Sequence, residues 1–486
     1  MQNRKPISPE VRDSFPTVRD YLDMDSRPVP ESLLETSSED LGNEPVDKRI
    51  YTSPDYAVLE EAYVWKKTWQ LACRENDIPE VGDRIVYDVL DQSFVLVRQE
   101  QGIKAFYNVC MHRGTRLVGE HDPLSGKDIA CSFHNWQYGL DGGLKRIPCR
   151  WDFPEVQDGQ VHLTEVKVGT WNGFVFINMD PDCEPLEAFL GETIPRHFKS
   201  WPYDNAAKIG HFGKVLPCNW KVAVGAFLEV YHVNQTHAGI MSISGDCNSQ
   251  YDSWGDHARQ MMCIGVPSPH LGDMAEDAQM ILDDWLDSAI VGTFGGDALD
   301  VPELPEGAGI KEVRQICAEI ARKTRKDKLG IDYSDVSDTE ILDSIQYFIF
   351  PNFFLFGGKG FPLAYRVLPV RGDHESCVFE VIAMMQGPDG APLAKDVPLT
   401  MTPTDEPWEA LQAAFGKGVA VFDQDQANLV KFQSGLRQNG LKQVHFSNYQ
   451  ERNIRNFLNS LERRIADGQR ARSEGGAAGY AGPRGV

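Results

Sequence analysis

Long apolar segments are missing from this sequence. No run of 18 or more apolar residues occurs, so we expect no transmembrane helix. The N-terminal Met-Gln-Asn-Arg-Lys-Pro has no apolar stretch behind its charges, so we expect no secretory signal. The ten cysteines are scattered without the spacing of a disulfide framework. These absences together predict a cytoplasmic protein that is not bound to a membrane and keeps its thiols reduced.

Positive charge is also scarce. The chain has 48 Lys and Arg against 71 Asp and Glu, which gives a net charge of −23. This balance argues against nucleic acid or an anionic membrane as a partner. The sequence also lacks a Gly-x-Gly-x-x-Gly unit for a flavin or nicotinamide. If the protein carries out redox chemistry, its electrons therefore come from another protein.

What the chain does contain is two short Cys–His motifs. Cys110-Met-His112 and Cys131-Ser-Phe-His134 are separated by 18 residues. A structural zinc site usually takes two Cys from one loop and two His from another, whereas each loop here offers one of each. Mixed pairs suit a Rieske [2Fe–2S] cluster, in which Cys ligands hold one iron and His ligands hold the other. We predict that cluster, with a zinc site as the alternative.

A second group of candidate ligands follows Asn219-Trp220-Lys221. Glu229, His232 and His237 lie in a stretch that we predict to be helical from Trp220 to about His237. Two His and one distant carboxylate form the facial triad of non-haem Fe(II) oxygenases. The two histidines are five residues apart, about 140° around a regular helix. They can share one metal only if the helix ends or bulges between them; otherwise they are two unrelated side chains.

These motifs resemble the large (alpha) subunits of Rieske non-haem iron oxygenases, the aromatic-ring-hydroxylating dioxygenase family. The resemblance covers about residues 50–240 and 345–465 and is weak or absent across 240–345. It implies that His232, His237 and Asp425 bind the mononuclear iron, with Asp423 as the rival of Asp425. Glu229 takes the place of the carboxylate that bridges to a cluster histidine of a neighbouring subunit. The substrate pocket implied by the resemblance includes Phe227, Asn352 and Phe354.

The predicted fold class is α+β. An all-β Rieske domain is inserted near the N-terminus of a catalytic domain, which has an antiparallel sheet flanked by helices in a helix-grip arrangement. We expect an N-terminal arm (1–49) that either wraps a neighbouring subunit or is disordered. A Rieske domain (50–185, with a leading helix at 53–68), a catalytic domain (186–467, with an insertion at 240–345) and a disordered tail (468–486) follow. We expect Trp136 to pack the cluster loop. The catalytic domain is expected to contain a strand at 348–356 and helices at 186–190, 310–329, 339–347, 406–415, 419–436 and 449–467.

The expected function is that of a Rieske-type oxygenase component. It would use a [2Fe–2S] cluster and Fe(II) to hydroxylate an aromatic or alicyclic small molecule with O₂. Its electrons would come from NAD(P)H through a reductase, with or without a ferredoxin. The resemblance implies a homotrimer, with or without a small beta subunit.

Three other functions remain open from the sequence. Monooxygenation or oxidative demethylation uses the same triad, so the motifs do not separate it from dihydroxylation. A Rieske electron carrier without oxygenase activity would use only the cluster. A mononuclear zinc hydrolase would use the second site, with structural zinc at the first.

Overall fold

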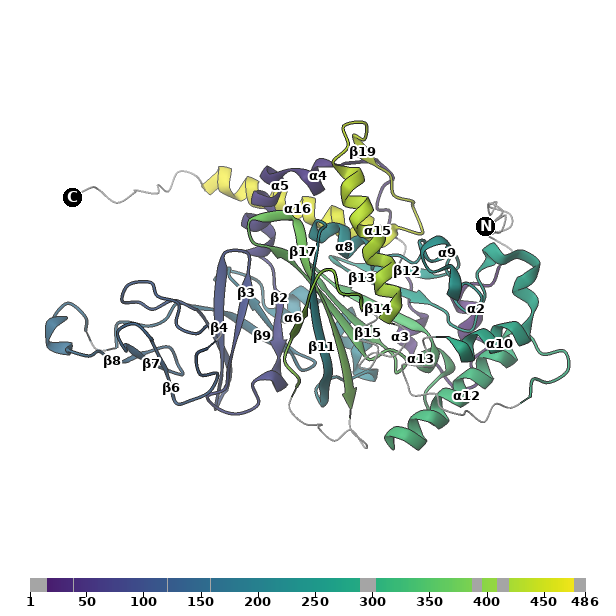
Figure 1. Cartoon of the computed structure of the whole chain (residues 1–486), viewed down its shortest axis with the longest axis horizontal. Helices are drawn as coiled ribbons and strands as arrows, with labels where there is room; N and C mark the ends of the chain where they lie inside the picture. The colour runs from purple at the N-terminus through teal and green to yellow at the C-terminus, as the bar shows by residue number, and fades with distance from the viewer. Residues whose placement is uncertain are drawn as a thin grey trace.

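The computed structural model describes residues 15–37, 39–119, 121–157, 159–288, 303–386, 396–408 and 419–475. Within these ranges the strands form sheets of two, three, six and eight strands. Figure 1 shows the three-stranded sheet at the left end of the molecule and the eight-stranded sheet near its centre. The fold is α+β with the Cys–His motifs N-terminal to the larger sheet, as predicted. No helix in the described ranges is long and apolar enough to cross a bilayer.

The six-stranded sheet supports the Cys–His loops. Its strand order is β2-β10-β9-β5-β4-β3, and β4 (Gln92–Gln99) shows why it is stable. Phe94 and Leu96 face one hydrophobic core, while Val95 and Val97 face another that contains Cys110. The small sheet packs on this second core. The other strands are β2 (Gln70–Arg74), β3 (Arg84–Val89), β5 (Gly102–Tyr107), β9 (Glu165–Trp171) and β10 (Phe174–Asn178), and those of the small sheet are β6 (Asp128–Ala130), β7 (Gln137–Gly139) and β8 (Leu144–Arg146).

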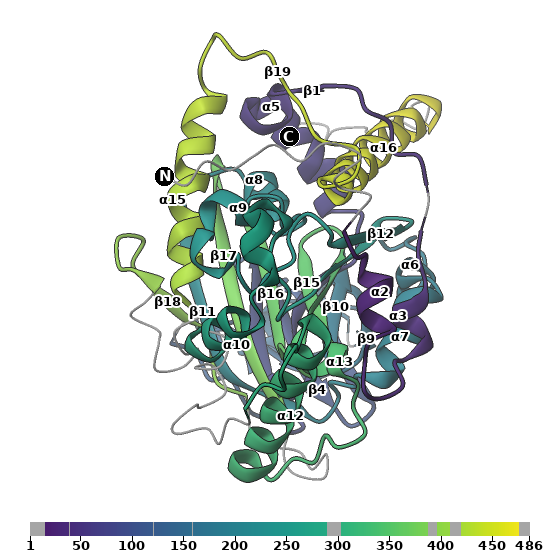
Figure 2. The same ribbon diagram turned by 90° about the vertical axis from the view of Figure 1, so that its right-hand side faces the viewer.

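The eight-stranded sheet is antiparallel except where β11 pairs with β18. Its order is β12-β13-β14-β15-β16-β17-β11-β18. Figure 2 shows α15 on one side of this sheet and α2, α3 and α7 on the other. The strands are β11 (Ala206–Leu216), β12 (Gln250–Trp254), β13 (His257–Met262), β14 (Ser344–Ile349), β15 (Phe353–Gly357), β16 (Leu363–Val370), β17 (Asp373–Gln386) and β18 (Thr400–Thr402).

Strands β12 and β13 correct the prediction that 240–345 is an insertion. Both belong to the main sheet, where β13 pairs with β14. They were missed because polar residues are buried in them. Arg259 Nη2 lies 2.6 Å from Asp252 Oδ2, and both side chains are almost fully buried. Because these charged residues occupy buried positions, the strands lack the alternation of apolar and polar residues by which a strand is usually recognised.

The helices agree in part with the sequence. α12 (Ile310–Leu329) has the predicted bounds, and α6 (Leu186–Leu190) and α15 (Ala420–Leu436) are close to theirs. The leading helix begins after Ser53, whose side chain caps Tyr56 N, and forms α5 (Pro54–Glu60) before a π-helical turn at Glu61–Trp65. The predicted helix at 406–415 lies largely outside the described residues. The remaining helices are α4 (Arg49–Thr52), α7 (Thr193–His197), α10 (Ala278–Asp287) and α13 (Asp338–Leu342).

Two other predicted elements near residue 345 are wrong. The helix expected at 339–347 ends at Leu342, and β14 begins at Ser344 because Ile345, Tyr347 and Ile349 alternate into one core. The strand expected at 348–356 is two strands, β14 and β15. The turn between them contains Pro351, which has no N–H to donate to a sheet.

The N-terminal arm packs on its own chain. It contains α2 (Val18–Leu22) and α3 (Glu31–Leu34), and Tyr21 and Leu33 are buried in the core beneath the eight-stranded sheet. Ser26 donates to Asp338 from its backbone N (2.6 Å) and its hydroxyl (2.8 Å). The described part of the arm is therefore ordered against its own chain. Its end, β1 (Val46–Asp47), pairs with β19 (Gln443–Val444).

The last helix, α16, is longer than predicted. It spans Arg452–Gly475, so the first residues of the expected disordered tail are helical. Gly468 lies directly against the ring of Tyr63, where a larger side chain would clash. A glycine that was taken as the start of a tail is therefore a packing position inside a helix.

Candidate metal centres

The first candidate centre is built by two similar turns. Cys110 N donates to Thr115 O (2.8 Å), and Gly114 N donates back to Cys110 O (3.0 Å). In the second turn Cys131 N donates to Trp136 O (2.8 Å), and Asn135 N donates to Cys131 O (2.9 Å). Gly114 and Asn135, at the same place in each turn, both have positive φ. The repeated geometry brings the two Cys–His pairs to one end of the domain.

The side chains of this centre divide into a buried and a partly exposed half. Cys110 and Cys131 are buried, and Tyr138 Oη lies 3.2 Å from Cys110 Sγ. The rings of His112 and His134 are partly exposed, with centroids 4.7 Å apart. Trp136 stacks on His112 at 4.8 Å, so it packs the loop as predicted. Two buried thiols and two partly exposed imidazoles match a Rieske cluster, in which Cys ligands hold one iron and His ligands hold the other.

Two observations test whether these residues fit such a cluster. His134 Nδ1 is buried without a hydrogen-bond partner, which is expected of an atom that binds a metal. Furthermore, these four residues do not form a group in which all ligand atoms lie within 4.8 Å, although the described residues contain two such groups elsewhere. One zinc ion would need that proximity, whereas a two-iron cluster spreads its ligands. The donor set therefore fits [2Fe–2S] better than zinc.

The second candidate centre brings together His232, His237 and Asp425. Asp425 Oδ1 lies 3.0 Å from His237 Nε2 and 3.6 Å from His232 Nε2. The three ligand atoms form one of the two groups within 4.8 Å. Each imidazole presents Nε2 to the carboxylate, because each Nδ1 is engaged elsewhere. This donor set fits a two-His-one-carboxylate site for Fe(II).

The backbone around these histidines corrects the predicted long helix. α8 (Trp220–Ala226) ends at Phe227, and only the short α9 (Val233–Thr236) separates His232 from His237. The helix therefore stops before the first histidine. The geometric condition is met by α9, which ends at Thr236, between the two histidines.

Asp423, the rival carboxylate, faces elsewhere. Its Oδ1 accepts from Trp408 N at 2.7 Å. Because Asp423 and Asp425 are two residues apart on α15, they occupy different sides of the helix. The structure brings Asp425, and not Asp423, to the two histidines.

Glu229 is tied to His232 by both of its oxygens. Oε1 lies 2.6 Å from His232 Nδ1, and Oε2 accepts from His232 N at 3.0 Å. Burial disfavours the charged imidazolium, but Glu229 and Asp425 outweigh it and raise the pKa of His232 to about 8. The two carboxylates thus make this point attractive to a cation.

Sequence reasoning missed Gln424. Its Oε1 lies 2.7 Å from His237 Nδ1, so it does for His237 what Glu229 does for His232. The only signal in the sequence was its position next to Asp425. A contact that was not predicted joins the two helices of the site: Asn219 N donates to Gln433 Oε1 (2.9 Å), which fixes α8 against α15.

The predicted pocket residues fall into two places. Phe227 contacts Phe354 (ring centroids 6.2 Å apart) and stacks on Phe379 at 4.7 Å, so these rings form an apolar wall. The Phe227 ring also lies 6.3 Å from that of Phe422, three residues before Asp425 on α15. Asn352 donates to Val367 O at 2.8 Å and so holds the turn before β15. A cavity of about 540 Å³ is lined by Glu229, His232 and Asp425.

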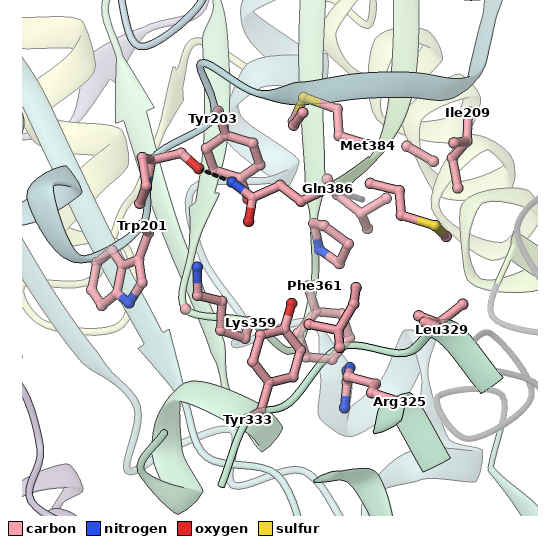
Figure 3. A pocket seen from close by; sticks show the side chains of 18 residues that line it. Trp201, Tyr203, Ile209, Arg325, Leu329, Tyr333, Lys359, Phe361, Met384 and Gln386 are labelled. Atoms are coloured by element: carbon pink, nitrogen blue, oxygen red, sulfur yellow. Dashed lines mark hydrogen bonds between the residues drawn. The ribbon is translucent and has the colours of Figure 1, made fainter. Parts of the chain in front are cut away.

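A separate, smaller cavity of about 110 Å³ lies at one end of the eight-stranded sheet. Figure 3 shows Arg325, Tyr333 and Lys359 reaching it from one side and Met384 and Ile209 from the other. It contains none of the candidate metal ligands. The chemistry of the two metal centres therefore does not involve it.

Two family models match the chain. One, described as the Rieske [2Fe-2S] domain, covers residues 68–157. The other, described as the ring hydroxylating alpha subunit (catalytic domain), covers residues 194–288 and 308–467. The second match runs through most of 240–345, so the expectation that family resemblance is weak or absent there is wrong.

Curated relatives include both oxygenase types. The carnitine monooxygenase oxygenase subunit of Escherichia coli (strain K12) is 30% identical over 197 residues, which are 40% of this chain and 52% of that protein. The biphenyl dioxygenase subunit alpha of Metapseudomonas furukawaii is 32% identical over 209 residues, 40% of this chain and 44% of that protein. The chain thus spans about half the length of the curated relatives it matches.

Solved structures share the fold over nearly the whole chain. A quaternary ammonium Rieske monooxygenase matches with a TM-score of 0.60 and 17% identity, covering 87% of this chain and 95% of that one. Naphthalene 1,2-dioxygenase from Rhodococcus sp. matches with a TM-score of 0.54 and 17% identity, covering 95% and 99%.

Proposed function

Because the chain belongs to the family of Rieske-type ring-hydroxylating alpha subunits, we propose that it is the oxygenase component of an O₂-dependent hydroxylating system. The observation that carries this proposal is the convergence of His232 and His237 Nε2 on Asp425. Cys110, His112, Cys131 and His134 would hold the [2Fe–2S] cluster. His232, His237 and Asp425 would hold Fe(II).

When bound, the cluster supplies single electrons and Fe(II) activates O₂. The protein's own contribution is orientation. Glu229 and Gln424 hold the two imidazoles so that Nε2 points into the site. The wall of Phe227, Phe354 and Phe379 would offer an apolar surface to the substrate.

The electrons would cross between two copies of the chain. Figure 1 places β6–β8, next to the cluster loops, at the left end of the molecule and α9 and α15, which flank the triad, in its right half. The cluster end exposes Phe133 (60%) and Trp151 (81%), which suits docking on another chain. The cavity beside Glu229 would receive that surface. Inter-subunit electron transfer has been described for the quaternary ammonium Rieske monooxygenase that shares this fold.

The remaining partners follow from the family. A separate reductase, with or without a ferredoxin, would deliver electrons to the partly exposed His112 and His134. Transfer between copies requires an oligomer, and a homotrimer with or without a small beta subunit meets that need. We place the protein in the cytoplasm, in line with Cys218 and Cys377, whose sulfurs lie 3.9 Å apart without a bond.

The first candidate reaction is hydroxylation of an aromatic or alicyclic small molecule. The second candidate is hydroxylation or demethylation by monooxygenation. The aromatic wall can stack on a ring, and it can also face a quaternary ammonium through cation–π contact. The carnitine monooxygenase relative favours keeping this second candidate. Only product analysis separates the two.

The decisive experiment combines metal analysis with labelled oxygen. The holoenzyme should contain three irons per chain, two of them with acid-labile sulfide. Reduced enzyme should be incubated with ¹⁸O₂ and panels of aromatic and quaternary ammonium compounds. Both label atoms in one product would show dihydroxylation, and one atom would show monooxygenation. A colourless protein, or one with two irons and no oxygen consumption, would refute the proposal.

A further inference from the structure

Asp246, Cys247 and His270 form a second compact group of metal-ligating side chains. Their ligand atoms lie within 4.8 Å of one another, the same criterion that finds the His232–His237–Asp425 triad. The described residues contain no third group of this kind. We propose that Asp246, Cys247 and His270 bind a zinc ion at a site distinct from both iron centres.

The strongest support is the state of the Asp246 carboxylate. The residue is only 1% exposed, and its Oδ1 accepts from Cys247 N and from Ser268 Oγ, both at 2.7 Å. Oδ2 is buried and has no hydrogen-bond partner. A buried carboxylate oxygen without a partner is costly, and a cation beside it removes that cost. The other two side chains of the group supply the ligands that such a cation needs.

The three types of ligand atom in this group indicate which cation it binds. A thiolate, an imidazole and a carboxylate together suit Zn²⁺, whereas Ca²⁺ and Mg²⁺ prefer oxygen ligands alone. Zn²⁺ also binds such sites more tightly than Fe²⁺. Cysteine binds zinc as the thiolate, so zinc binding displaces the Cys247 thiol proton. Three protein ligands leave the fourth position of the ion to water.

The position of the group suggests what the ion does. Asp246 and Cys247 precede β12, and His270 lies in a 3₁₀ segment, η6 (Pro269–Glu276). These two segments already meet through Ser268 Oγ, which donates to Asp246 Oδ1 at 2.7 Å. Ser268 N also donates to Met241 O at 2.6 Å, and Met241 follows His237 by four residues. Zinc would therefore fasten the loop that leads away from the second triad histidine.

Metal content of the full chain tests this proposal. The purified wild-type protein should contain about one zinc per chain in addition to its iron. Cys247→Ser and His270→Gln should each lower the zinc content at least about tenfold, while the cluster absorbance stays unchanged. Cys149→Ser, which changes an exposed cysteine outside the group, should retain the zinc. Cobalt substitution should give a thiolate charge-transfer band in the wild type that Cys247→Ser lacks.

Three results would overturn it. The first is wild-type protein with no zinc and no uptake of added zinc. The second is zinc that remains in both Cys247→Ser and His270→Gln. The third is zinc that is lost in Asp425→Ala and kept in Cys247→Ser, which would place the ion in the triad. The first two results leave the function proposed above untouched, whereas the third would also put zinc where that function needs Fe(II).

Discussion

Gln424 Oε1 lies 2.7 Å from His237 Nδ1, while the residue that follows it, Asp425, faces Nε2 of the same ring. Two neighbouring residues of α15 therefore contact the two nitrogens of the His237 ring. The bond to Gln424 selects the tautomer that leaves Nε2 free for a metal.

Replacing Gln424 by Leu should therefore weaken iron binding. We expect about a tenfold loss of affinity, since a lost partner of a ligating His typically has an effect of this size. Competition with a ferrous chelator measures it. Lys431→Gln, an exposed change on the same helix, is the control. Unchanged affinity in Gln424→Leu would mean that the bond does not orient the ring.

Asp425 and Asp423 can be separated by matched alanine variants. Asp425→Ala should lose most of the mononuclear iron and keep the cluster spectrum. Asp423→Ala should keep the iron but lower thermal stability, because it removes the acceptor of Trp408 N. Iron analysis and melting curves on both variants check this. The reverse pattern of iron loss would assign the ligand to Asp423.

Glu229→Gln should keep both metal centres and lose turnover. The amide has nearly the same shape, but it lacks the charge of the carboxylate beside His232. We expect turnover to fall about 10- to 100-fold with iron content unchanged. Glu451→Gln, which alters another carboxylate at the same cavity, should have a smaller effect. If both changes lowered turnover equally, Glu229 would have no specific role in electron transfer.

Glu380 should make stability depend on pH. Burial raises its pKa, but Arg366 and His211 outweigh this and lower it to about 2 from 4.5. A carboxylate with a lowered pKa stabilises the fold above its ordinary pKa, and this stabilisation is lost as the pH falls toward 2. The shift corresponds to on the order of 3 kcal/mol.

Urea unfolding between pH 5 and pH 2 measures this loss. Arg366 Nη1 also donates to Leu71 O and Ala72 O in the Rieske sheet, so the two sheets should loosen together. Glu380→Gln should flatten the pH dependence, whereas Glu165→Gln, which changes an exposed carboxylate, should leave it unchanged. If the free energy of unfolding of Glu380→Gln still depended on pH as in the wild type, the dependence would come from other titratable groups.

The sequence predicted those parts of the centres that depend on residue type and spacing. His232 and His237 were singled out by residue type and spacing and Asp425 by family resemblance, and the structure brings the three side chains together. Gln424 was not singled out, because glutamine has no such pattern and its role depends on which side of α15 it occupies. The helix α12 was predicted to the residue by its period, and β12 and β13 were missed because Asp252 and Arg259 neutralise each other inside the sheet.

The N-terminal arm shows the same limit. Its residues are polar and Pro-containing, so nothing local predicts order. Its order comes from distant partners such as Asp338, which accepts from Ser26. Contacts of this kind cannot be predicted from neighbouring residues in the sequence. They explain why the arm, which was expected to be disordered or to wrap another subunit, is ordered on its own chain.

That same contact has a consequence for biosynthesis. Ser26 and Asp338 are 312 residues apart, so the ribosome must add all of the intervening chain before the arm can dock. At about 5–20 residues per second, the arm waits for roughly 15–60 s after it has been made. During that time Tyr21 and Leu33 have no core to enter, and chaperones have their best opportunity to bind the nascent chain there.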